Sequence, residues 1–91
     1  MSLKIYLHFE GPPQHTKLIK VAFECSYTAS GLLRIFADAY RRKYPEVEAL
    51  QEALLELRSH SGTIYPAESV LSFSPGSETD FAILRSPEGP R

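Results

Sequence analysis

The segment from Thr28 to Pro45, TASGLLRIFADAYRRKYP, constrains the fold of this chain more than any other stretch. Its apolar residues recur at the three- and four-residue steps of an α-helix, and its polar residues fall together on the opposite side. The apolar set is Leu32, Leu33, Phe36, Ala39 and Tyr40, and the polar set is Arg34, Asp38, Arg41 and Arg42. A helix of about four turns with so wide an apolar stripe is only marginally stable alone. We therefore expect it to lie on a sheet.

The sequence also marks both ends of this helix. Thr28 or Ser30 can cap the first turn, and the basic residues near the end suit the negative pole of the helix dipole. Pro45 disfavours helical geometry at Tyr44, so the helix should end there.

Two segments before the helix alternate apolar and polar residues, as strands with one buried face do. In residues 3–9 the inward set is Leu3, Ile5, Leu7 and Phe9, and the outward set is Lys4, Tyr6 and His8. In residues 17–25 the inward set is Ile19, Val21, Phe23 and Cys25, and the outward set is Lys20, Ala22 and Glu24. The sequence GPPQHT at 11–16 is a short turn, so the two strands should form an antiparallel hairpin.

The segment after Pro45 has two interpretations. Val47, Leu50, Leu54 and Leu57 are spaced as in a second helix, whereas Leu55 and Leu57 alternate with Glu56 and Arg58 as in a strand. We expect a short helical or irregular turn over 46–52, a strand over 53–59, a turn at 60–62 and a short strand at 63–65.

The rest of the chain contains one clear strand. Residues 66–79 are rich in serine and proline and predict an irregular connection, with Val70, Leu71 and Phe73 held against the core. Residues 80–85 predict a last strand with Phe81 and Ile83 on one face. We expect one domain over 1–85, followed by a polar tail or linker over 86–91.

Composition limits the class of protein. The chain has 91 residues, 43% hydrophobic and 23% charged, and a formal net charge of −1, which are values of a small soluble domain without a general attraction to nucleic acid. It has no apolar run as long as a membrane span and no signal-peptide pattern, and its single cysteine excludes an internal disulfide. We expect an intracellular, cytoplasmic protein.

The order of elements resembles the ubiquitin-like superfamily. The residues that carry the resemblance are a threonine-capped helix after the second strand, a proline soon after that helix, and LLELRSHSGTIYPAESVL at 54–71. The likeness covers residues 2–85. It implies an α+β, ubiquitin-like β-grasp fold, with a mixed sheet of four to five strands, one main helix across it, and the order ββαββ with a short fourth strand.

Two departures from that family narrow the expected function. Conjugated members end in a glycine pair, whereas this chain ends SPEGPR, so we do not expect a modifier. The positions that match ubiquitin's apolar receptor patch hold Glu56 and Arg58, so ordinary ubiquitin receptors should bind weakly or not at all.

The sequence offers little support for catalysis, a cofactor or a metal. His8, His15 and His60 lack the paired spacing of a zinc site. Cys25, expected to point inward, fits a small buried hydrophobe better than a nucleophile. The glycines form no phosphate-binding loop, and the glutamates of 46–56 form an acidic ridge that is better explained as solvated surface.

The outward residues of the expected sheet suggest a binding surface. They give an aromatic and aliphatic centre with a basic rim, and they are Lys4, Tyr6, His8, Leu18, Lys20, Ala22, Arg58 and Leu84. Such a patch favours a peptide or short helix with an apolar anchor and flanking acidic residues. The alternative is that Tyr6 and Leu18 only cover their own sheet.

The basic side of the helix is a second candidate surface. Arg34, Arg41, Arg42 and Lys43 could contact phosphates, but Asp38 and the acidic ridge partly neutralise them, so nucleic acid is not the expected partner. Nor do we expect a membrane partner, and the domain should be monomeric.

We therefore expect a non-catalytic interaction module, the N-terminal domain of a larger scaffold, cytoskeletal or regulatory protein. One alternative is a Phox and Bem1 type domain, which pairs heterotypically or with itself through a basic patch and an acidic motif. The alternative from another class is a small enzyme or a sulfur-carrier-like protein.

Overall fold

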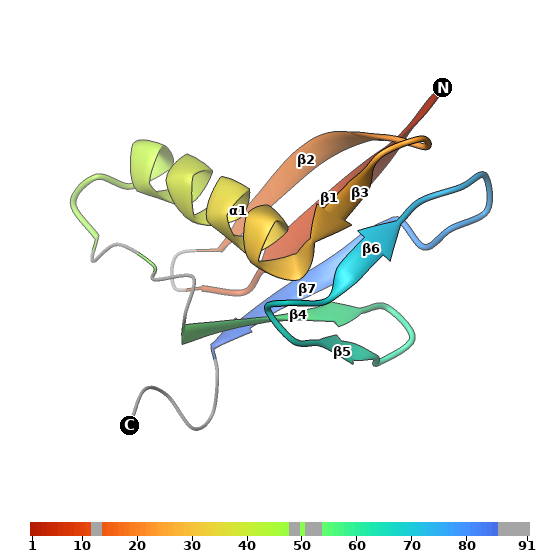
Figure 1. Cartoon of the computed structure of the whole chain (residues 1–91). Helices are drawn as coiled ribbons and strands as arrows, with labels where there is room; N and C mark the ends of the chain where they lie inside the picture. The colour runs from red at the N-terminus through yellow and green to blue at the C-terminus, as the bar shows by residue number, and fades with distance from the viewer. Residues whose placement is uncertain (12–13, 48–49, 51–53, 86–91) are drawn as a thin grey trace.

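The computed structural model (Figure 1) describes residues 1–11, 14–47, 50 and 54–85. It is an α+β fold with one helix and seven strands in that part of the chain. In order they are β1 (Ser2–Phe9), β2 (His15–Ala22), β3 (Ser26–Thr28), α1 (Ala29–Lys43), β4 (Leu55–Ser59), β5 (Ile64–Tyr65), β6 (Val70–Ser72) and β7 (Asp80–Arg85). Five strands form a mixed sheet in the order β2-β1-β7-β4-β5, and β3 and β6 form a separate pair.

The mixed character of the main sheet comes from its last strand. β1 and β2 form the predicted antiparallel hairpin, in which Tyr6 lies opposite Leu18. β7 enters between the two halves of the sheet, parallel to β1, with Asp80 beside Tyr6. β4 then pairs with β7 in antiparallel fashion, and Arg58 lies beside Ala82. Segments from the two ends of the chain therefore share the centre of one sheet.

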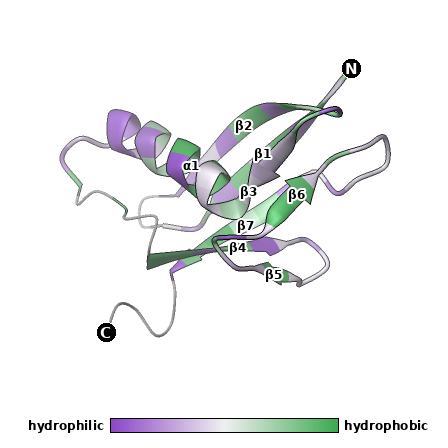
Figure 2. Cartoon of the chain, viewed as in Figure 1, coloured by the Kyte–Doolittle hydropathy of each residue, from purple (hydrophilic) through white to green (hydrophobic). Residues whose placement is uncertain are grey.

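Helix α1 packs across one face of this sheet as predicted. Oγ1 of Thr28 accepts a hydrogen bond from the Gly31 amide at 3.1 Å, so Thr28 is the N-cap. The helix ends at Lys43, before the residue that precedes the proline. Its buried residues are Ala29, Leu32, Leu33, Phe36 and Tyr40, close to the predicted stripe. Figure 2 shows apolar strands beneath the helix and hydrophilic residues towards its C-terminal end.

The second strand ends earlier than predicted, and this overturns the inward placement of Cys25. The chain turns after Ala22, where the Cys25 amide donates to the Ala22 carbonyl at 3.3 Å. The two-residue alternation stops at this turn, so Cys25 is exposed rather than buried. The hydroxyl of Tyr27 accepts the Ala22 amide at 2.9 Å and helps to hold the turn.

The prediction of an irregular connection over 66–79 is partly wrong. Val70–Ser72 forms β6, and Thr28 and Val70 are partners in its pairing with β3. A strand places neighbouring side chains on opposite sides, so Leu71 is buried while Val70 is 67% exposed and is not held against the core. Phe73 is buried as predicted. Because β3 and β6 were not anticipated, the expected order ββαββ is not confirmed.

The segment with two interpretations contains a strand. Leu55–Ser59 is β4, with Leu55 and Leu57 buried, and Gly62 forms the predicted turn into β5 with a φ of 101° that favours glycine. Of the expected turn over 46–52, residues 48–49 and 51–52 lie outside the described residues. So do residue 53 of the expected strand and the expected tail at 86–91.

Candidate functional site

The face of the main sheet opposite α1 is called the outer face. Its residues follow from the strand register, because Lys4 lies opposite Lys20 and Tyr6 opposite Leu18. The next row brings together His8, Ala82 and Arg58 from β1, β7 and β4. The structure therefore gathers the predicted residues on one face, with Ala22 at one end and Leu84 beside β4. Tyr6 is 38% exposed and Leu18 is 46% exposed.

The predicted basic rim is only half present. Lys4 and Lys20 extend it on the β1 and β2 side. On the other side Asp80 lies beside Tyr6, and Glu56 lies beside Leu84. The sequence reasoning did not assign Asp80 to this face, because its place depends on the parallel pairing of the first and last strands. The outer face is therefore basic at the end with the two lysines and mixed in charge elsewhere.

His8 is the centre of a hydrogen-bonded group on the outer face. Its Nδ1 lies 3.1 Å from Oγ1 of Thr16, and its Nε2 lies 3.0 Å from Oδ1 of Asp80. A carboxylate accepts, so Nε2 donates to Asp80, and in the neutral ring Nδ1 accepts from the Thr16 hydroxyl. The imidazole also stacks on Tyr6, with ring centroids 6.2 Å apart and planes 15° apart. These contacts set the orientation of His8 beside the tyrosine.

The hydrogen-bonded pair of His8 and Asp80 is too exposed to resemble an enclosed catalytic site. The side chains of His8 and Asp80 are 45% and 54% exposed, so water competes for their hydrogen bonds. The hollow next to them, lined partly by Arg58 and His60, measures about 130 Å³. The arrangement therefore orders part of an exposed surface at the His8 and Asp80 end of the outer face.

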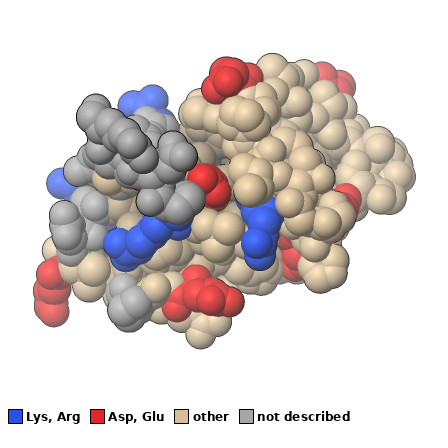
Figure 3. All heavy atoms as spheres, turned by 90° about the horizontal axis from the view of Figure 1, so that it is seen from below, with Lys and Arg blue, Asp and Glu red and all other residues tan. Residues whose placement is uncertain are grey.

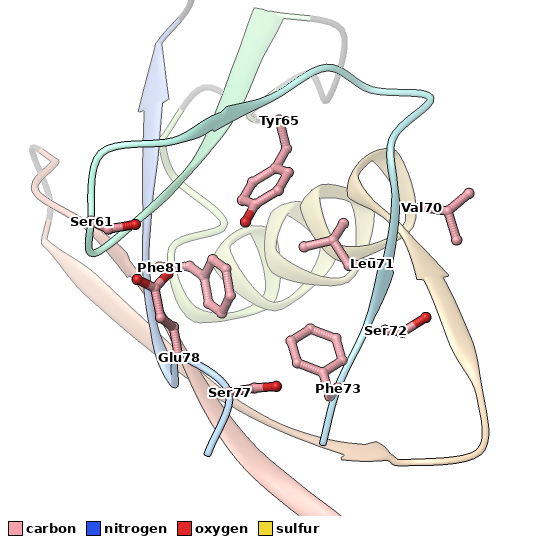
Figure 4. A pocket seen from close by; sticks show the side chains of 9 residues that line it. All are labelled: Ser61, Tyr65, Val70, Leu71, Ser72, Phe73, Ser77, Glu78 and Phe81. Carbon is pink, nitrogen blue, oxygen red and sulfur yellow. The ribbon is translucent and has the colours of Figure 1, made fainter. Parts of the chain in front are cut away.

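A larger hollow of about 450 Å³ lies between β5 and β6 (Figure 4). Its residues are Ser61, Tyr65, Val70, Leu71, Ser72, Phe73, Ser77, Glu78 and Phe81. In Figure 4 the side chains of Leu71, Phe73 and Phe81 turn inward, whereas Val70 turns away. Phe73 and Phe81 are only 4% exposed, and their ring centroids lie 6.2 Å apart. Their rings therefore fill the core and leave little apolar surface for a ligand.

On the face shown in Figure 3, basic and acidic side chains are interspersed among uncharged surface. Within the described residues there is no group of three or more histidine, cysteine, aspartate or glutamate side chains that could hold a metal ion. No helix in that part of the chain is both long and apolar enough to cross a membrane.

Comparison of the chain with protein-family models, with curated proteins and with solved structures finds no match.

Proposed function

We propose that this chain is a non-catalytic protein-interaction domain of the ubiquitin-like β-grasp type, which binds a peptide on its outer face. The parallel pairing of β1 with β7, the hairpin of β1 and β2, and a single helix across the sheet support this fold class. Such a domain has one sheet face covered by the helix and a second face that is open to a partner.

The observation that carries the proposal is the composition of two neighbouring rows on this face. Tyr6 and Leu18 form an exposed cross-strand pair, and Lys4 lies opposite Lys20 in the next row. Like charges directly opposite each other destabilise a sheet. No ion pair within the described residues involves either lysine. An acidic partner would remove this repulsion, so the domain gains more from binding than the covered apolar area alone provides.

The proposed partner has a defined arrangement of charges. An apolar side chain would cover Tyr6 and Leu18, and its acidic residues would lie towards Lys4 and Lys20. Acidic residues on the opposite side of the anchor would meet Asp80. The preferred peptide is therefore acidic on one side of its apolar anchor, which refines the symmetrical basic rim expected from the sequence.

Selection from a peptide library tests this proposal. The 91-residue chain should enrich peptides with an apolar anchor and acidic residues on one side, and Tyr6→Ala with Lys20→Glu should abolish their capture. The matched control is Ile35→Ala with Arg34→Glu, which removes an exposed apolar residue and reverses a charge on α1. Circular dichroism checks that both variants stay folded. Equal capture by the two folded variants would refute binding on the outer face.

A further inference from the structure

A second surface lies between the edge strand β2 and the C-terminal half of α1. It is a groove of about 670 Å³, and its ionisable lining comes from His15 and Lys17 of β2 and from Arg42 and Lys43 of α1. No acidic residue is among the residues that line it. The charged side chains that line the groove, Lys17, Arg42 and Lys43, are therefore all basic.

The backbone of β2 borders this groove with an open edge. β2 is eight residues long and stands at the end of the sheet, where β1 is its only strand partner among the described residues. An edge strand presents unpaired N–H and C=O groups that can pair with another extended chain. Hydrogen-bonding groups and positive charge thus lie side by side.

His15 reports the electrostatic character of the groove. Its ring packs among the rings of Phe36, Tyr40 and Tyr44, with centroids 5.5, 6.1 and 5.9 Å away. This burial lowers the pKa of His15, and the positive charges of Lys43 and Lys17 lower it further. Because Lys17, Arg42 and Lys43 line the groove without an acidic residue, the local potential is positive and favours an anion. Within the described residues, no ion pair involves Lys17, Arg42 or Lys43.

We propose that an extended acidic segment of a partner protein adds to the sheet at the free edge of β2, with its carboxylates against Lys17, Arg42 and Lys43. Backbone pairing favours a peptide over a nucleic acid, because only a peptide supplies the N–H and C=O groups that an open strand edge needs. A second copy of this chain is a poor occupant, because two β2 edges would bring their lysines together.

Each set of cations also has a local explanation. Lysines on an edge strand deter unwanted pairing, and cations in a last helical turn suit the helix dipole. Neither effect requires Lys17 of the strand and Lys43 of the helix to line one groove. An acidic strand would use both sets together. This inference goes beyond binding on the outer face. The two surfaces share Leu18 of β2, but Tyr6 belongs only to the outer face and Lys43 only to the groove.

The test uses a labelled nine-residue peptide of alternating aspartate and valine with blocked ends, titrated into the 91-residue chain by fluorescence anisotropy at low salt. Lys17→Gln with Lys43→Gln removes two charges from the groove, and this variant should weaken binding about 2- to 30-fold, the sum of two exposed charge pairs. Arg34→Glu changes the net charge equally on α1, outside the groove lining, and should leave the affinity within about twofold. Replacing aspartate by asparagine in the peptide should weaken binding in the same way.

Two further measurements test where the peptide binds. Amide hydrogen exchange of β2 should slow when the peptide binds, whereas that of β5 should not change. Tyr6→Ala should leave this affinity unchanged, so failure of outer-face binding and failure of the groove are separate results. The proposal is overturned if the peptide does not bind, if both charge variants weaken it equally, if β2 amides gain no protection, or if a nine-nucleotide oligouridylate binds more tightly than the peptide.

Discussion

The two faces of strand β1 differ in what their side chains do, although they alternate along the same eight residues. Ile5, Leu7 and Phe9 point towards α1 and are almost completely buried. Lys4 and Tyr6 point the other way, and no described element covers them. The helix side therefore holds the domain together, whereas substitutions on the outer face should leave the domain folded.

The two faces differ because their side chains have different neighbours. The rings of Phe9, Phe36 and Tyr40 meet edge-on or tilted at centroid distances of 5.5–6.1 Å, so each contributes packing as well as buried area. The outer face instead carries the opposed lysines Lys4 and Lys20, which weaken the sheet. Mutations on the two faces should therefore separate stability from recognition.

The largest effect should come from Phe36→Ala on the helix side. Phe36 is fully buried against Phe9 and Tyr40, so its removal should lower the free energy of unfolding by about 3–5 kcal/mol. Ile35→Ala is the matched control, because Ile35 is 42% exposed and its truncation should cost about 1 kcal/mol or less. Urea unfolding measures both. Equal losses would contradict the division between a packed and an open face.

A smaller loss is expected at the start of α1. Thr28→Ala removes the hydroxyl that accepts the Gly31 amide and should cost about 0.5–2 kcal/mol. Thr28→Ser keeps the hydroxyl and should recover most of the loss. Thermal or urea unfolding of the three proteins checks this order, and an alanine variant as stable as the serine variant would show that the cap does not secure the helix on its sheet.

On the outer face a substitution should stabilise the domain rather than destabilise it. Lys20→Glu replaces the repulsion with Lys4 by an attraction and should raise the free energy of unfolding by about 0.2–1 kcal/mol. The same change should weaken capture of acidic peptides. Urea unfolding at low and high salt measures the gain, which added salt should reduce. A destabilised Lys20→Glu protein would mean that the two lysines do not repel each other in the folded sheet.

The smallest expected effect is a pH dependence from His15. Burial, Lys43 and Lys17 lower the pKa of His15 in the folded chain, so below its unfolded value of about 6.5 the unfolded chain binds more protons. Stability should therefore fall as the pH drops from about 6.5 through the lowered pKa. His15→Gln should reduce the slope of unfolding free energy against pH. Identical slopes for the His15 variant and the natural chain would contradict this.

Much of the fold could be predicted because its strongest patterns are local. The apolar spacing and the cap of α1, the alternation in β1, and the strand at 80–85 each follow from residues that are near one another in sequence. The end of β2 was misplaced because alternation continues through Phe23 to Cys25, while a backbone turn after Ala22 is not visible in hydropathy. The β3 and β6 pair was missed because its partners are three residues long and more than forty positions apart.

Some features of the candidate site could also be predicted from the sequence, and others could not. Alternation alone places Tyr6, Leu18 and the lysines on the outward side of their strands, so these residues could be named from the sequence. The arrival of Asp80 beside Tyr6 and the hydrogen bonds of His8 could not, because they depend on a parallel pairing between the first and last strands. The basic groove likewise needs the C-terminal half of α1 to lie over β2.

Residue spacing was enough to identify the inward side chains of β1, β4 and β7 and the end of the helix, because these features depend on residues within a few positions of one another. Only the tertiary structure decided which charges became neighbours, since the strand order β2-β1-β7-β4-β5 joins segments from both ends of the chain. Electrostatic interactions act through space, so the position of Asp80 beside Tyr6 and the basic groove beside β2 exist only after the sheet has formed.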